Sequence, residues 1–237
     1  MPHGAAIPSY NAFLTTASTA TPLSFRENRF LHWICLGTVL VFGLAAFRPD
    51  TYFDWALENG LVFVTIPVLA LTYRRFAFSD LSYLAILIYL AIHEFGAHYK
   101  YSDVPLGEWL KPLLHTTRNH YDRISHFSFG FLIAYPFREI AMRSLHVRGR
   151  WLYWLPVETT LALSAIYEIL EALAANILTP QRGEEFVGMQ GDMWDSQEDM
   201  AMAALGSIVA VLVIAAIVRR RTARISGQRV EALAAAK

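Results

Sequence analysis

Acidic residues and histidines stand at helix spacing inside or beside long apolar runs of this sequence. Glu94 and His98 are four residues apart, so they share one face of a helix. Asp122 and His126 have the same spacing, and Arg123 stands beside them. Carboxylates and imidazoles catalyse proton transfer and bind divalent metal ions. These pairs are therefore candidates for catalysis or metal binding.

Two later segments add more acids. Glu168 and Glu171 form an i, i+3 pair inside an apolar run. Asp192, Asp195 and Asp199 would share one face if the next helix has already begun at Asp192. An acid inside a membrane costs several kcal/mol unless it is paired or faces water, so such residues are functional hypotheses by default.

A structural interpretation competes for some of these residues. Asp195, with an acid three residues after it, fits a capping box, and Asp122 could cap the helix that follows it. Acids at helix amino ends also suit the helix dipole. Glu94, Glu168 and Glu171 do not fit this interpretation, because none of them stands at a predicted helix start.

We expect one polar site to form from these residues. The candidate catalytic residues are Glu94, His98, Asp122, His126, Glu168 and Asp199, and the candidate substrate-binding residues are Arg118, Arg123 and Asp195. Arginines at such a site could hold a phosphate. No particular cofactor is indicated, but a divalent metal ion is one hypothesis, with ligands drawn from Glu94, His98, His126, Glu168, Glu171 and Asp199. The HExxH spacing and the Glu-x-x-His spacing of di-metal bundles are both absent.

Long apolar runs must position these groups. Hydrophobic residues make up 55% of the 237 residues, and they are bunched rather than scattered. A membrane-spanning helix needs roughly 20 apolar residues. The predicted spans are residues 30–47, 57–73, 81–98, 124–142, 151–178 and 200–218. The sequence therefore predicts an all-α fold, a polytopic membrane bundle with about six transmembrane helices.

The predicted organisation is a flexible cytoplasmic arm (residues 1–28), a membrane helix bundle (29–219) and a basic cytoplasmic tail (220–237). The lipid bilayer is the expected partner. The formal net charge of zero gives no sign of nucleic-acid binding. The sequence leaves the oligomeric state undefined.

Arginine-rich segments alternate with arginine-poor loops. The rich segments precede the first span, connect the second to the third and the fourth to the fifth, and follow the sixth. By the positive-inside rule both termini are predicted to be cytoplasmic. The acid-bearing ends of spans three to six then lie together on the non-cytoplasmic side.

Four segments carry a family resemblance. They read HEFGAHYKYSDVPLGEWL, RNHYDRISHFSFGF, YEILEAL and GMQGDMWDSQEDMAMAALG. They resemble the YjdF-like bacterial inner-membrane proteins, a family of unknown function, over roughly residues 30 to 220. The resemblance implies a bacterial inner-membrane location and a multi-helix fold, and it supplies no reaction.

A second resemblance is to VanZ-like membrane proteins. Their pattern has an acid and a basic residue ahead of a histidine, which Asp122, Arg123 and His126 match. An acid on the next helix follows, and Glu168 matches it. Their third element, D-x-x-x-N-x-x-G, is matched by the acid at 199 and the glycine at 206, but alanine stands at 203 where the pattern has asparagine.

Three classes of function fit the sequence. The first is an enzyme at the outer membrane interface that acts on a lipid, isoprenoid-linked or envelope substrate. The second is a small transporter whose acids bind ions, although no inverted repeat stands out. The third is a structural or regulatory membrane protein in which the polar groups only fasten helix ends. The sequence leaves open whether the protein is an enzyme.

Overall fold

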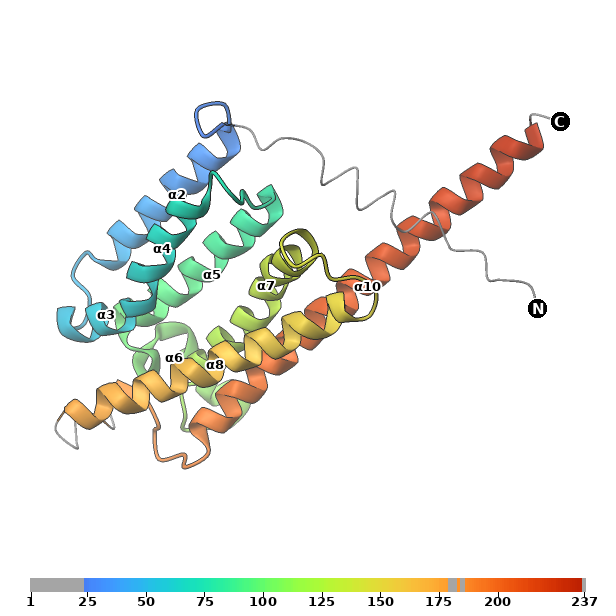
Figure 1. Cartoon of the computed structure of the whole chain (residues 1–237). Coiled ribbons are helices and arrows are strands. Elements are labelled where there is room, and N and C mark those ends of the chain that lie inside the picture. Colours follow the sequence, from blue (N-terminus) through green and yellow to red (C-terminus); the bar gives the residue numbers. More distant parts are fainter. Residues whose placement is uncertain (1–23, 179–182, 184–185, 236–237) are drawn as a thin grey trace. The chain divides into compact units, whose positions relative to one another are not determined.

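A computed structural model describes residues 24–178, 183 and 186–235 of the chain, and these residues form helices joined by loops (Figure 1). Most of the predicted amino-terminal arm lies outside the described residues. Residues Ser24–Val211 form one compact unit, and the described part of a second unit is the continuation of the last helix beyond Leu212.

The described helices follow one another along the chain as α2 (Arg29–Ala45), α3 (Tyr52–Glu58), α4 (Gly60–Thr72), α5 (Asp80–Tyr99), the short 3-10 turn η1 (Tyr101–Asp103), α6 (Pro105–Leu114), α7 (Tyr121–Arg143), α8 (Trp151–Ile177) and α10 (Asp195–Ala235). A helix stands at each of the six predicted spans. The predicted all-α fold is therefore confirmed.

Three described helices are long and apolar enough to cross a membrane, namely α5, α8 and residues Asp195–Ser226 of α10. The bent pair of α3 and α4 makes a fourth if it counts as one broken span. Helix α2 is apolar but has 17 residues, and α7 has 23 residues, five of them charged. The chain is a multi-pass membrane protein in which charged positions of α7 are placed inside the bundle.

The second predicted span is broken where it meets α3. Helices α3 and α4 are bent by 47° at Asn59, which stands between them. The Asn59 side chain donates a hydrogen bond to the Trp55 carbonyl (2.9 Å), which closes the end of α3. Glu58 and Asn59 are both buried at this bend. The break thus brings an acid and an amide into the bundle interior.

Helix α7 is the centre of the compact unit. It packs against α5 on one side and α8 on the other, and α2 covers the far side of α5 (Figure 1). Helix α10 crosses α7 at two glycines: a Cβ atom added at Gly130 would lie 1.9 Å from the Ala203 carbonyl oxygen, and one at Gly206 would lie 2.1 Å from that of Phe127. Such close backbone approach is typical of membrane helices that meet at small residues.

The carboxyl end of α7 is joined to the amino end of α5 by a buried acid. Glu139 accepts hydrogen bonds from the backbone N–H and hydroxyl of Ser79, from the Ser82 hydroxyl and from Arg143. Every hydrogen-bonding direction of this carboxylate is used. It is a structural fastening of two helix ends.

Candidate functional site

The amino end of α7 places an acid and a histidine against α8. His126 Nε2 lies 3.5 Å from an oxygen of Asp122, one turn earlier, and 3.3 Å from Glu168 Oε1 on α8. The other ring nitrogen, Nδ1, lies 3.1 Å from the Ser164 hydroxyl. When Nδ1 donates its proton to Ser164, Nε2 presents a lone pair toward the two carboxylates.

Helix α10 adds a third element to this group. One ligand atom from each of Asp122, His126 and Asp199 lies within 4.8 Å of the other two, an arrangement that can hold a metal ion. Asp199 is 1% exposed and His126 8% exposed. We refer to Asp122, His126, Glu168 and Asp199 as the acid–histidine cluster.

Two oxygens of the cluster are buried without a hydrogen-bond partner among the described residues, Glu168 Oε1 and Asp199 Oδ1. The 3.3 Å contact between His126 and Glu168 is an ion-pair distance but does not have hydrogen-bond geometry. A buried charge without a partner is strongly unfavourable. These oxygens are therefore positioned to bind a proton or a cation.

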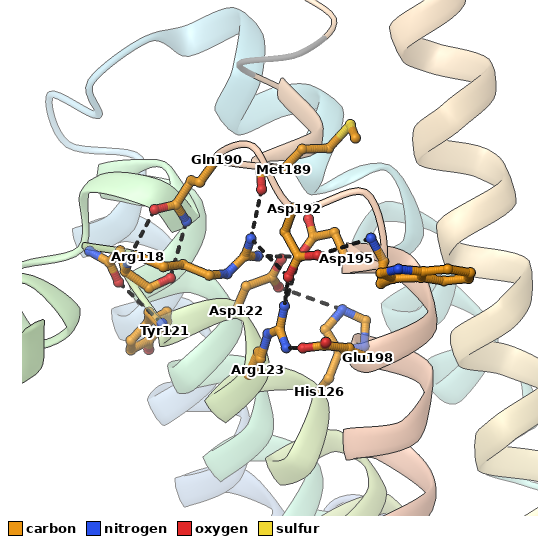
Figure 2. A network of polar contacts seen from close by, with 12 residues as sticks. Arg118, Tyr121, Asp122, Arg123, His126, Met189, Gln190, Asp192, Asp195 and Glu198 are labelled. Carbon is orange, nitrogen blue, oxygen red and sulfur yellow. Dashed lines mark hydrogen bonds and ion pairs between the residues drawn. The ribbon is translucent and has the colours of Figure 1, made fainter. Parts of the chain in front are cut away.

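Two arginines, Arg118 and Arg123, connect the start of α7 to the loop that precedes α10, beside Asp122 and His126 of the cluster (Figure 2). Arg118 bonds Asp195 and donates to the Met189 carbonyl at 2.7 Å. Arg123 bonds Asp192 at 2.8 Å and also contacts Glu198. The arginines are thus engaged by acids and a carbonyl of this loop and of the first turn of α10. Asp199, one turn later, forms no ion pair with an arginine in the described part of the chain.

The positive charge of Arg118 and Arg123 affects the pKa of two neighbouring groups that precede α10 and α7. The pKa of Asp192 is below its usual range because the Trp194 backbone N–H bonds it and because Arg123 and Arg118 lie close. The pKa of His120 is also lowered, first by burial and then by the same two arginines. Asp192 therefore favours its negatively charged form and His120 its neutral form, so the positive charge of this region is carried by the two arginines.

Two predicted residues lie in other contacts. Glu94 is 1% exposed, and its Oε2 accepts hydrogen bonds from the Trp55 indole (3.2 Å) and the Asn59 amide (3.5 Å). Its Oε1 is buried without a hydrogen-bond partner among the described residues, like the two cluster oxygens. His98 Nδ1 lies 2.8 Å from the Ala45 carbonyl oxygen. Neither belongs to the three-ligand group, and Glu171, half-buried three residues after Glu168, does not either. The structure brings together Asp122, His126, Glu168 and Asp199 of the predicted residues.

The starts of α7 and α10 show where the two candidate cap residues, Asp122 and Asp195, stand. Helix α7 is preceded by His120 as its cap residue, so Asp122 stands inside the first turn rather than at the cap. Helix α10 begins at Asp195, whose carboxylate is engaged by Arg118. Asp192 therefore precedes the helix, and the acids that share a helical face are Asp195 and Asp199.

Glu58 is a further candidate residue near the cluster, and the spacing patterns of the sequence do not single it out. It is 8% exposed and accepts a hydrogen bond from the Tyr167 hydroxyl at 2.6 Å. The Tyr167 ring in turn lies 6.1 Å from the His126 ring, so Glu58 is one side chain away from the cluster. An acid beside an apolar run is the signal that singled out Glu94, and it applies equally to Glu58.

A pocket lies against Glu58. Its wall includes Asp54, Glu58, Lys100, Tyr101, Phe186 and Gly188. The Tyr101 hydroxyl is 2.7 Å from His93 Nδ1, so a second histidine lies behind this wall. The pocket combines carboxylate, ammonium, phenol and aromatic groups at the end of the bundle that carries the acid–histidine cluster.

The fold and the site define a class: a helical, multi-pass membrane protein with a buried cluster of acids and a histidine. Residues 30–221 match the family described as "Predicted membrane protein (DUF2238)". The chain belongs to this family. Over 162 residues it is 37% identical to "Inner membrane protein YjdF" of Escherichia coli (strain K12). The aligned region covers 68% of this chain and 77% of that protein. No solved structure matches the chain.

These comparisons confirm the YjdF-like resemblance and the bacterial inner membrane as the location. The chain is an integral membrane protein of an uncharacterised family, and the bilayer is its environment. The resemblance to VanZ-like proteins and the cytoplasmic orientation of the termini stay predictions.

Proposed function

We propose that this protein is a membrane enzyme that uses a divalent metal ion held by Asp122, His126 and Asp199, with Glu168 beside them, on a lipid- or envelope-linked substrate. One observation carries the proposal: three ligand atoms from three residues of two helices lie within 4.8 Å of one another. His126 and Asp199 are buried and Asp122 is half-buried, and the cluster holds carboxylate oxygens without a hydrogen-bond partner among the described residues.

The contrast with Glu139 supports a role beyond structure. Glu139 is as deeply buried, but its carboxylate accepts from two serines and from Arg143. A polar group that only fastens helices is expected to be satisfied in this way. Asp199 and Glu168 each retain a buried oxygen without a partner in the described chain. A bound cation or proton would provide the partner that each oxygen lacks.

The donor set fits a hard or borderline divalent ion. Carboxylate oxygen and imidazole nitrogen suit Mg, Mn, Fe and Zn. The Ser164 hydroxyl accepts from His126 Nδ1 when that nitrogen is protonated, which fixes the ring orientation and leaves Nε2 free as a ligand. A bound divalent ion supplies Lewis-acid activation of water or of a substrate oxygen.

The remaining residues have roles of their own in this proposal. Arg118 and Arg123 hold the loop before α10 over the cluster, and their charge would attract an anionic group such as a phosphate. Glu58 and Tyr101, in the wall of the pocket, are placed to donate or accept a proton from a bound substrate. The surrounding bilayer makes a lipid-linked substrate the most accessible class.

Metal analysis of the purified full-length protein tests the proposal. The wild-type chain is expected to retain a stoichiometric divalent ion after gel filtration without added metal. His126→Ala and Asp199→Asn are expected to lose it, because each removes one of three ligands. Glu94→Gln is the matched control, a buried glutamate whose partners are Trp55 and Asn59, and it is expected to keep the metal.

Thermal unfolding of the same variants distinguishes a metal site from a purely structural network. Folded wild-type protein without metal, together with strong destabilisation of both ligand variants, would overturn the enzyme proposal in favour of a structural network. Equal loss of metal from Glu94→Gln would show that the ion binds elsewhere.

A further inference from the structure

Helix α6 exposes a continuous apolar face. Leu106, Trp109, Leu113 and Leu114 are 43%, 68%, 65% and 53% exposed. Their spacing of three, four and one residues places them on one side of a helix. Glu108 and Lys111 lie on the other side and pair with each other at 2.5 Å. The ten-residue helix is therefore amphipathic, and these four large side chains of its apolar half are exposed.

The opposite face of α6 is fixed to the start of α7. The Asn119 amide donates to the Val104 carbonyl (3.0 Å) and to Glu108 (2.9 Å). Asn119 is fully buried, and a Cβ atom added at Gly107 would lie 1.5 Å from its oxygen. Gln190 also bonds the Asn119 backbone N–H, at 2.8 Å. The helix cannot roll over to bury its apolar face without breaking this contact.

We propose that α6 lies in the surface of the membrane, with its apolar face in the boundary between lipid headgroups and acyl chains at the site end of the bundle. Ten residues span about 15 Å as a helix, half of what is needed to cross the hydrocarbon layer. The helix connects α5 to α7, both of them helices of the membrane bundle, so it lies at the level where these helices end.

The composition of α6 selects lipid over other occupants. A helix that lies in the membrane interface has an apolar face with tryptophan or leucine and a charged face toward water. The Glu108–Lys111 pair leaves no net charge to recruit a charged protein. Exposed apolar side chains also cover α2 and α8, for example Val39, Leu40 and Ile169, so the apolar face of α6 extends the lipid-facing surface of the bundle.

Spin-label depth measurement tests this placement. The full chain carries Cys35→Ser, which removes its one cysteine, and either Leu113→Cys or Lys111→Cys, labelled with a nitroxide in vesicles of phosphatidylethanolamine and phosphatidylglycerol. The label at position 113 is expected to collide more with oxygen dissolved in the lipid than with a water-soluble nickel chelate. The label at 111, on the opposite face, is expected to show the reverse preference.

Two results would overturn the inference. A label at 113 that collides mainly with the nickel chelate would place the helix in water. A label at 113 shielded from both reagents would mean that a second copy or another protein covers the face. A parallel measurement with Leu106→Cys is expected to repeat the lipid preference, which excludes a disturbance at one position as the cause.

Discussion

Asp195 and Asp199 stand one turn apart on α10 and have opposite surroundings. Both are buried, at 3% and 1% exposure. Asp195 is neutralised by Arg118 and lies 3.4 Å from Arg123, whereas an oxygen of Asp199 has no hydrogen-bond partner among the described residues. Four residues thus separate a carboxylate paired with arginine from one that keeps a buried oxygen without a hydrogen-bond partner among the described residues.

Arg118→Gln is expected to destabilise the protein by roughly 3 kcal/mol, because it leaves the buried Asp195 carboxylate with the 3.4 Å contact to Arg123 in place of its closest ion pair. The free energy of unfolding in detergent is the measurement. Arg148→Gln, on an exposed loop, is the control and is expected to change stability by less than about 0.5 kcal/mol. Equal stability of the two variants would show that the buried pair contributes nothing to folding.

At the scale of helices, the crossing of α7 and α10 sets the geometry of the site. Gly130 and Gly206 let the two backbones approach closely. Asp199 stands on the same helix seven residues before Gly206, so the crossing fixes its position relative to α7. The close crossing therefore positions the proposed metal ligands on α7 and α10.

Gly206→Ala is expected to cost about 2 kcal/mol of stability, because its methyl group would overlap the Phe127 carbonyl and force the helices apart. Gly43→Ala is the matched control: no atom lies within 4 Å of its added Cβ, so the change is expected to be neutral or to stabilise α2 by up to about 1 kcal/mol. Thermal unfolding of both variants distinguishes them. Similar melting temperatures would contradict the close crossing.

At the scale of the whole molecule, the sequence predicts where the helices lie because an apolar run marks each of them. Among the described residues, α5, α8 and α10 also have the length and composition that a bilayer requires. Four of the predicted site residues also meet, since helix direction alone brings the ends of α7, α8 and α10 together. The partners of Glu94 and His98 could not be predicted in this way. Their helix face is set by the spacing, but the neighbour on that face is set by packing.

Local backbone geometry accounts for the residues that were missed. The 47° bend at Asn59 brings Glu58 inward, and periodicity gives no sign of such a break. The loop before α10 folds back so that Gln190 reaches Asn119. Contacts between a loop and a helix start depend on the path of the loop, which hydropathy does not encode.

The most direct test of the metal site is pulsed electron paramagnetic resonance of the full chain loaded with Mn²⁺. We expect a hyperfine coupling from one histidine nitrogen, because His126 Nε2 is the proposed nitrogen ligand of the acid–histidine cluster. This coupling should change when histidine labelled with heavy nitrogen is incorporated. Bound Mn²⁺ with no histidine coupling would contradict the account, since it would place the ion on carboxylates away from His126.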